Sequence, residues 1–305
     1  MPGAAVIQSI LSMPVISRAI KQFTPPVARP AFRFAKFAAW CACRSFSRCF
    51  RSPGAPFEVA ILYLVAEKSR YSNTHKFVER YRRLLGGDRV TLVQIDNFKP
   101  DLVPRLIGRN SWEMGGDNSS WEFSGWKRAI GTLKQLGVKA DVLIFINDAC
   151  LNHNRDELYY RMRFDWRCLN LARTHLVGCI DHSDCQHLLL GHDVSTFVRS
   201  NFFAMPHALA GDLAWTFAEP DLLSRILPER LSEPVISRTE ELNENFRSFL
   251  ENWITVRWHR SAKPTPTNWP FLRQKAVACL NERMLTAMVR QKGYPTFDAT
   301  NVLWG

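Results

Sequence analysis

The sequence predicts an α/β protein with a mostly parallel sheet flanked by helices, and three observations indicate this class. The 305-residue chain is 46% hydrophobic, which is enough to build a sizeable core. From residue 57 onward, strand-like and helix-like segments alternate, as in proteins that join parallel strands through helices. Two strand-like segments, 57–66 (FEVAILYLVA) and 141–146 (DVLIFI), are nearly continuous apolar runs, which is typical of strands buried on both faces.

Each element follows from a local pattern. Ser72 or Asn73 can cap a helix, because both side chains accept hydrogen bonds from the free N–H groups of a first helical turn. This helix ends at Gly86-Gly87, since glycine closes many helices. Trp126 falls on the apolar stripe of the next helix and is expected in the core. The remaining expected elements are a strand at 89–95, a polar glycine-rich loop at 109–121, a helix from Glu122, strands at 141–146, 175–180 and 196–205, and helices at 240–253 and 271–292.

Charge divides the chain into two parts. The chain carries 40 Lys and Arg and 28 Asp and Glu residues, for a net charge of +12. Residues 1–57 hold eight of the basic side chains and no acidic one, so the remainder has a net charge of only +4. The stretch 52–56 (SPGAP) is typical of a linker. We therefore expect a basic amphipathic N-terminal arm and linker at 1–56 and a nearly neutral globular domain at 57–305.

The arm is expected to meet an anionic membrane surface. At helical spacing, the basic side chains between Arg29 and Arg51 fall on one face and apolar side chains on another. Such a helix can lie at the boundary of a bilayer, so residues 18–51 are expected to bind anionic lipids. The alternative is a helix that packs on its own domain with a solvated basic side. Nucleic acid is not expected as a partner, because the body of the chain is nearly neutral.

Three absences in the sequence bear on location. No stretch reaches the roughly 18 apolar residues that a membrane-spanning helix needs. The N-terminus lacks the early basic residues of a secretory signal, and the eight cysteines contain no Cys-x-x-Cys pair. We therefore expect a reduced, cytoplasmic protein that is peripheral on the inner face of the cell membrane.

Polar residues gather where the predicted strands end. Asp96 follows the strand at 89–95, and Asn147 with Asp148 follows the strand at 141–146. In open α/β sheets, ligands bind at the carboxyl ends of the strands. A carboxylate at the tip of a buried strand can hold a hard divalent cation together with diphosphate oxygens and waters, and Asp148 is the first candidate for this contact. The alternative is that Asn-Asp is only a turn signal.

Several stretches together resemble a known class of enzyme. The segment GDNSSWEFSGWKRAI (116–130), followed by ADVLIFINDAC (140–150), resembles GT-A type glycosyltransferases, and more closely the rhamnan synthesis F family and related bacterial polysaccharide glycosyltransferases. TFVRSNFFAM (196–205) and KAVACLNERMLTAMVRQKG (275–293) are similar to later segments of those enzymes. The resemblance implies a GT-A, Rossmann-like domain at 57–305. It also implies transfer of a sugar, rhamnose or another deoxysugar, from a nucleotide-sugar donor to a bacterial polysaccharide or lipid-linked acceptor.

The resemblance and the polar strand ends together give the expected site. Asp148 is expected to contact a divalent cation, Mn²⁺ or Mg²⁺. Asp181 and Asp184 are the candidate catalytic residues, because they follow a predicted strand and an inverting transfer needs a carboxylate to accept the proton of the acceptor hydroxyl. The alternative for both is a solvated loop acid. The residues expected to bind the donor are Asp96, Asn110, Asn118, Glu122, Asn147, Asp148 and Arg199.

Departures from the family pattern keep other interpretations open. The Asp-x-Asp of metal-dependent relatives is reduced to Asn147-Asp148-Ala149. A cationic side chain such as Arg199 can therefore replace the metal at the leaving diphosphate. The same departure leaves open a non-catalytic nucleotide-sugar or glycan-binding protein on a GT-A scaffold. Cysteine, aspartate and histidine also crowd into 179–192, but their spacings match no common zinc module, so an acceptor-side loop is expected there.

Overall fold

The computed structural model describes residues 57–66, 72–152, 160, 163–213, 215, 220–257 and 263–300. The chain divides into two units, one of Met1–Phe57 with Trp304–Gly305 and one of Glu58–Leu303. The predicted arm at 1–56 lies outside the described residues, so its helix and its lipid contact stay predictions. Among the described helices, none has the length and apolar character that crossing a membrane requires.

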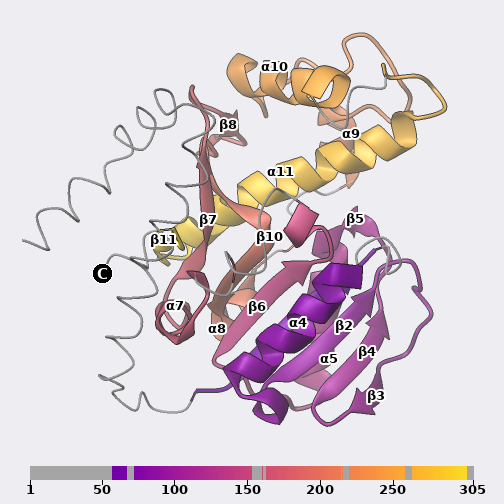
Figure 1. Ribbon diagram of the computed structural model, residues 1–305. Coiled ribbons are helices and arrows are strands. Elements are labelled where there is room, and N and C mark those ends of the chain that lie inside the picture. The colour runs from indigo at the N-terminus through magenta and orange to yellow at the C-terminus, as the bar shows by residue number, and fades with distance from the viewer. Residues whose placement is uncertain are drawn as a thin grey trace, which may run out of the picture. The chain divides into compact units, whose positions relative to one another are not determined.

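One eight-stranded mixed sheet organises the unit Glu58–Leu303, with the order β11-β7-β10-β6-β1-β2-β4-β3 (Figure 1). Within it, β10 and β3 run antiparallel to their neighbours, and all other pairings are parallel. The prediction of a mostly parallel α/β sheet is therefore confirmed. Its strands are β1 (Val59–Val65), β2 (Thr91–Asp96), β3 (Arg105–Gly108), β4 (Ser111–Gly115), β6 (Val142–Asn147), β7 (Leu176–His182), β10 (Thr196–Pro206) and β11 (Thr296–Asp298). Outside it, β5 is Ser119–Trp121, and β8 (Leu188–Leu189) pairs with β9 (His192–Asp193).

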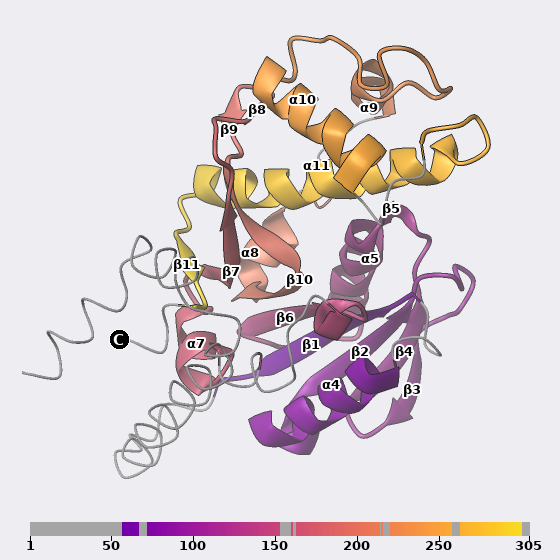
Figure 2. The same cartoon turned by 45° about the horizontal axis from the view of Figure 1, so that its top comes forward.

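Helices cover both faces of this sheet. Figures 1 and 2 show α4 (Ser72–Leu85) on one face and α5 (Glu122–Gln135) with α11 (Trp269–Gln291) on the other. The predicted helix at 240–253 is α10 (Glu244–Asn252), which continues into a π-helix at Trp253–Arg257. The shorter helices are α7 (Trp166–Leu171), α8 (His207–Asp212) and α9 (Pro220–Ile226), with 3-10 turns at Gly87–Arg89 and Cys150–Asn152.

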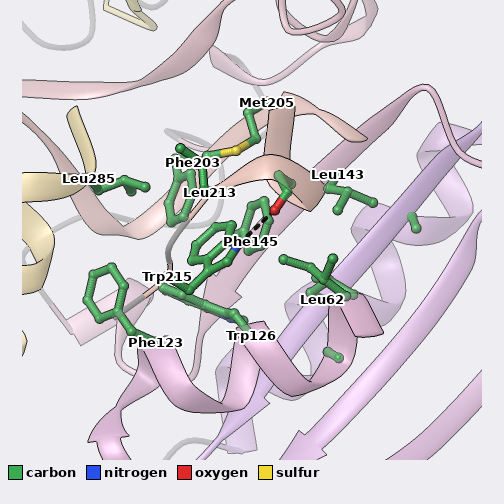
Figure 3. Packing of buried hydrophobic residues seen from close by; sticks show 14 of the residues in the cluster. Leu62, Phe123, Trp126, Leu143, Phe145, Phe203, Met205, Leu213, Trp215 and Leu285 are labelled. Atoms are coloured by element: carbon green, nitrogen blue, oxygen red, sulfur yellow. Dashed lines mark hydrogen bonds between the residues drawn. The ribbon is translucent and has the colours of Figure 1, made fainter. Parts of the chain in front are cut away.

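The core under α5 is aromatic. Trp126 is fully buried, as predicted, and its ring meets Phe145 of β6 and Phe203 of β10 edge-on, at centroid distances of 5.5 and 5.3 Å (Figure 3). Phe145 and Phe203 stack with centroids 4.6 Å apart. Trp215 joins them, and its indole N–H donates to the carbonyl of Ala210 at 2.8 Å, so this buried donor is satisfied.

The order of the strands creates a crevice at one end of the sheet. From β1 the chain adds β2 and β4 on one side and then returns through α5 to place β6 on the other side of β1. At such a switch point, the connections leave the two carboxyl ends in opposite directions, and a ligand can enter between them. Leu64 of β1 pairs in register with Asn147 of β6, so the crevice opens beyond this pair.

The predicted loop at 109–121 is wrong, because its first half is a strand. β4 pairs in parallel with β2 and is covered by the edge strand β3. The glycines that indicated a loop serve close packing instead. A Cβ atom on Gly115 would overlap the carbonyl oxygen of Lys99, and one on Gly116 would overlap the Asn97 side chain.

Candidate active site

A cavity of about 1130 Å³ opens at the switch point. Its floor includes the ends of β1 and β6 at Ala66 and Asp148, and one side includes Glu122 at the start of α5. Side chains from β10, from the loop after β7, from α10 and from α11 complete the lining. Its size suits a ligand with several groups rather than a single ion.

Asp148 is fixed at the tip of β6. Its side chain is only 3% exposed, and Oδ2 accepts a hydrogen bond from the N–H of Ala66 at 2.6 Å. The Asp148 carbonyl accepts a hydrogen bond from Thr74 Oγ1 of α4 at 2.7 Å. Beside it, Asn147 Oδ1 is buried without a hydrogen-bond partner among the described residues. A buried carboxylate and an unsatisfied amide oxygen thus belong to two consecutive residues that both line the cavity.

A buried carboxyl group, Glu122, and a partly buried one, Glu282, bracket Ser200. Ser200 donates from its backbone N–H to Glu282 Oε1 at 2.6 Å and from its hydroxyl to Glu122 Oε1 at 2.8 Å. The backbone donor is available because the pairing of β10 with β7 shifts register between Val198 and Phe203, which leaves Ser200 in an irregular stretch. Burial raises the pKa of both Glu122 and Glu282. Glu122 Oε2 is buried and has no hydrogen-bond partner among the described residues.

Lys275 of α11 brings a cation to these carboxyl groups. Its Nζ atom lies 3.3 Å from the ring centroid of Trp121. Trp121 has a left-handed backbone (φ 56°), which a bulky residue seldom adopts and which precedes the first turn of α5. Burial lowers the pKa of Lys275 to about 8, although the charges of Glu122, Asp148 and Glu282 act in the opposite direction. Lys275 therefore loses its charge as pH rises through about 8.

Asp181 and Arg199 form an ion pair in the same cavity. Arg199 donates to both carboxylate oxygens of Asp181, from Nε at 2.6 Å and from Nη2 at 2.9 Å. Both side chains are about one-third exposed. This two-point contact fixes Arg199 in orientation and engages both carboxylate oxygens of Asp181. Asp184, two residues after β7, also lines the cavity.

A buried arginine organises the loop after β7. Arg283 Nη1 donates to Ser183 Oγ at 2.8 Å and lies 3.0 Å from His187 Nδ1. The guanidinium carbon lies 4.2 Å from the ring centroid of Phe197 and 4.4 Å from that of Phe249. Burial, and then the charge of Arg283, lower the pKa of His187 to about 4, so this imidazole is neutral at pH 7 and accepts at Nδ1.

The structure brings most of the predicted site residues together. Three of the predicted donor residues lie elsewhere. Asp96 pairs with Lys99 at 2.9 Å, and Asn118 accepts a hydrogen bond from Asn97 at 2.7 Å. Asn110 lies before β4, at the opposite end of that strand from Asn118, and donates to the carbonyl of Asp88. Those that line the cavity are Glu122, Asn147, Asp148, Asp181, Asp184 and Arg199.

Asn110 and Asn118 are corrections to the predicted site, and their physical reason is β4. A continuous loop at 109–121 would have placed both amides near Glu122. Because five residues of this segment form a strand, the two amides are separated along its length. The roles of the six residues that do line the cavity stay predictions.

The helix α11 contributes four residues that the predicted site does not include. Lys275, Cys279, Glu282 and Arg283 all line the cavity, and their spacing places them along one face of a helix. Three of these four residues are charged, although most of α11 is apolar. Charged residues that recur on one face of an apolar helix are a pattern that the sequence itself contains. No three His, Cys, Asp or Glu side chains in the described parts of the chain form a metal-binding group, which includes the histidine and cysteine cluster near 179–192.

Comparisons with known proteins give little beyond this geometry. A scan against protein-family models finds no match. A search of curated proteins finds no relative. Among solved structures, the chain is similar to a mannosyltransferase from Pyrobaculum calidifontis in complex with GDP-Man and Mn²⁺. The TM-score is 0.31 and the sequence identity 10%, with 86% of this chain and 85% of that chain covered. A likeness of this size establishes neither family nor activity, and the resemblance to the rhamnan synthesis F family stays a prediction.

Proposed function

We propose that this protein is a glycosyltransferase that uses a nucleotide-sugar donor. The observation that carries the proposal is the cavity at the switch point of the sheet, where Asp148 and Asn147 face a set of cationic side chains. Lys275, Arg199 and Arg283 line the same cavity and can offset the charge of a diphosphate. Stabilising the leaving diphosphate is the main electrostatic task in breaking the bond between a sugar and a nucleoside diphosphate.

A divalent cation fits this site as a ligand shared with the substrate. The described residues provide no group of three side chains for a cation held by protein alone. The carboxylate of Asp148 and the unsatisfied oxygen of Asn147 are hard ligands, however, and Mg²⁺ is often held by one or two protein oxygens plus phosphates and waters. We infer that these two residues hold Mn²⁺ or Mg²⁺ together with the donor. The cation would supply positive charge at the diphosphate.

The proton acceptor in the proposed reaction is a carboxylate of the cavity. Asp181 and Asp184 were expected in this role, but Asp181 is engaged by Arg199 through two hydrogen bonds. Burial raises the pKa of Glu122, and its Oε2 has no hydrogen-bond partner among the described residues, so this carboxyl group is suited to accept a proton. We therefore propose Glu122 as the first candidate and Asp184 as the second. Replacing each by its amide separates them, because only the true acceptor's variant loses turnover while still binding donor.

The sugar, the acceptor and the location are finer proposals. The first two rest on the sequence resemblance, and the location rests on the basic amphipathic pattern of the arm. These proposals are transfer of rhamnose or another deoxysugar, a bacterial polysaccharide or lipid-linked acceptor, and attachment to the inner face of the cell membrane through residues 18–51. Deleting residues 1–52 should abolish binding to anionic vesicles and leave nucleotide binding intact. Equal vesicle binding by both proteins contradicts the proposed role of the arm.

The test of the proposed function is a binding panel followed by turnover. UDP, GDP, dTDP and their sugars are added to the full-length protein, with Mn²⁺, with Mg²⁺ or with EDTA, and thermal unfolding is recorded. A ligand that binds only the folded state raises Tm, and at a hundredfold excess over Kd it adds about 2.7 kcal/mol to the free energy of unfolding. We expect one nucleotide class to stand out and its sugar to be cleaved or transferred.

The outcomes separate the two candidate functions. No shift with any nucleotide contradicts the glycosyltransferase and the nucleotide-sugar-binding protein, and leaves only the glycan-binding alternative. A shift without turnover for any donor, in the presence of the acceptors tested, favours the non-catalytic binding protein, which the incomplete acidic motif also favours. Activity that falls with EDTA and returns with Mn²⁺ or Mg²⁺ supports the shared cation. Activity that ignores EDTA assigns the diphosphate to the cationic side chains instead.

A further inference from the structure

The cavity has a second wall, formed by α10, whose chemistry differs from that of the strand ends. Asn245, Ser248, Phe249, Asn252 and Trp253 all line the cavity. Their spacing is i, i+3, i+4, i+7 and i+8, so they form one continuous stripe along α10 and the first residue of the π-helix. Figure 2 shows α10 beside α11, well away from β3 at the other end of the unit. The stripe consists of two carboxamides, a hydroxyl and two aromatic rings, without a charge.

The other two faces of α10 show that the cavity-facing stripe differs from an ordinary solvent-exposed helix face. Phe246, Leu250 and Ile254 face the apolar cluster under α9 and α11, and anchor the helix. The charged residues occupy a third stripe outside the cavity, where Arg247 pairs with Glu244 and Glu251. The helix thus has separate apolar, charged and cavity-facing stripes, and the cavity-facing one is neutral. The face of α10 that lines the cavity therefore carries no charge.

Neutral carboxamides and aromatic rings together suit a carbohydrate. A carboxamide both donates and accepts hydrogen bonds, as vicinal sugar hydroxyls require. An aromatic face offers flat apolar area for the C–H face of a pyranose ring, and Phe249 and Trp253 are both partly exposed. Phe249 is also held rigidly, since its ring lies 5.0 Å from that of His187 and below Arg283. A π-helix begins at Trp253, and single π turns often occur at functional sites.

We propose that the stripe Asn245–Ser248–Phe249–Asn252–Trp253 is the subsite for an uncharged glycan acceptor. This inference rests on the proposed function, because it assigns the second substrate of the same cavity. The two walls of the cavity differ in charge, so we assign them to different substrates. The wall that contains Lys275, Arg199 and Asp148 meets the anionic donor, and the α10 wall meets the neutral sugar residues of the acceptor.

The experiment measures glycan and nucleotide binding separately. A panel of neutral linear and branched tri- to pentasaccharides of hexoses and deoxyhexoses is tested against the full-length protein by saturation-transfer NMR and calorimetry. The nucleotide is measured in the same samples by calorimetry. The double variant Asn245→Ala/Asn252→Ala removes both carboxamides at exposed positions. It also removes the hydrogen bond from Asn245 Nδ2 to the carbonyl of Gln186 at 3.2 Å, so thermal unfolding of the variant is recorded beside the binding measurements. Asn170→Ala, an exposed asparagine on α7 outside the cavity, is the matched control, and Glu251→Gln tests the charged stripe of α10.

We expect at least one neutral oligosaccharide to bind. The double variant should weaken this binding about tenfold or more, as expected for two lost hydrogen-bonding groups, and leave the nucleotide Kd unchanged. Asn170→Ala and Glu251→Gln should leave both constants unchanged. The proposal is overturned if no neutral oligosaccharide binds, if only acidic ones do, or if the double variant binds as tightly as the unaltered protein. Glycan binding that depends on α10 in a protein that binds no nucleotide would instead contradict the proposed function and leave the subsite standing.

Discussion

The two halves of the sheet contribute to the cavity in different ways. The half β4-β2-β1-β6 is wholly parallel, and it delivers Asp148 simply by ending β6 beside β1. The half β10-β7-β11 contains a reversed strand with an irregular register, and it delivers Ser200 between two carboxyl groups. The regular parallel topology thus positions Asp148 at the tip of β6. The irregular register of β10 and the long helix α11 instead position the side chains with shifted pKa values, Glu282 and Lys275.

The largest expected effect is in the first half, at Asp148. Asp148→Asn keeps an oxygen that can accept from the N–H of Ala66, so the fold should persist, but it removes the charge that faces the donor. Turnover should fall by about a hundredfold or more, in line with the loss of one electrostatic contact at a reacting centre. Kinetics with the donor identified by the binding panel, together with thermal unfolding, measure both consequences.

Asp101→Asn is the matched control, since Asp101 is exposed and outside the cavity. Unchanged turnover in Asp148→Asn would show that the strand tip has only a structural role. The parallel half would then contribute shape without chemistry.

The packing of the parallel half can be tested at Gly115. Gly115→Ala puts a methyl group onto the Lys99 carbonyl oxygen, which is backbone and cannot rotate away. We expect the free energy of unfolding to fall by about 2–3 kcal/mol. Gly131→Ala on α5 is the matched control, because nothing lies within 4 Å of its added Cβ. That change should stabilise the helix by about 0.5–1 kcal/mol. Equal effects of the two substitutions in denaturant titrations would contradict the close approach at the end of β4.

In the second half, we expect the affinity for a nucleoside diphosphate to depend on pH through Lys275. Its pKa of about 8 means that it loses its charge as pH rises through that value, so affinity for a nucleoside diphosphate should decline above pH 8. Lys275→Met should weaken this affinity about tenfold at pH 7 and remove the decline, since no proton remains to be lost. Lys275→Arg should keep affinity at pH 9, because arginine stays protonated. Lys127→Met, an exposed change on α5, is the control. A decline that persists in Lys275→Met assigns the titration to another group.

A smaller effect concerns stability in acid. His187 stays neutral in the folded protein down to about pH 4, whereas in the unfolded chain it takes up a proton near pH 6.5. The unfolded state therefore binds more protons over this interval, so His187 makes the free energy of unfolding fall as pH is lowered from about 6.5 to about 4. The slope from this group is about 1 kcal/mol per pH unit. His187→Gln keeps an acceptor for Arg283 and should lessen the slope in urea titrations at pH 6.5, 5.5 and 4.5. An unaltered slope would show that His187 is protonated in the fold.

The same contrast explains which features the sequence could predict. The strands predicted at 57–66 and 141–146 correspond to β1 and β6, because a strand buried on both faces needs an apolar run. The polar residues Asn147 and Asp148 mark the end of the second strand. The sequence also indicated α4, α5 and α11 through helical spacing. Helical spacing is less informative about single residues: the apolar residue Leu84 near the end of α4 is 53% exposed, because periodicity defines a buried face only to within about one residue.

The remaining features depend on contacts between distant residues. Ser200 and Glu282 are 82 residues apart in sequence, and no local pattern announces the hydrogen bond that stabilises the irregular stretch of β10. Glycines 115 and 116 indicated a loop because glycine is common in loops. In the structure they instead allow the backbone to lie close to Lys99 and Asn97. Lys275 sits on a helix that was predicted correctly, but the sequence does not say that this face of the helix meets the cavity.

The ammonium group over Trp121 has an optical consequence. A cation held 3.3 Å from the indole centroid changes the energy of the excited ring, so the emission of Trp121 should change when Lys275 loses its proton or turns toward a bound anion. The chain contains ten tryptophans, and subtracting the spectrum of Trp121→Phe isolates this one. The cavity therefore carries its own fluorescent reporter, positioned at the group whose charge changes at about pH 8. Ligand entry can be followed in it without a label and in real time.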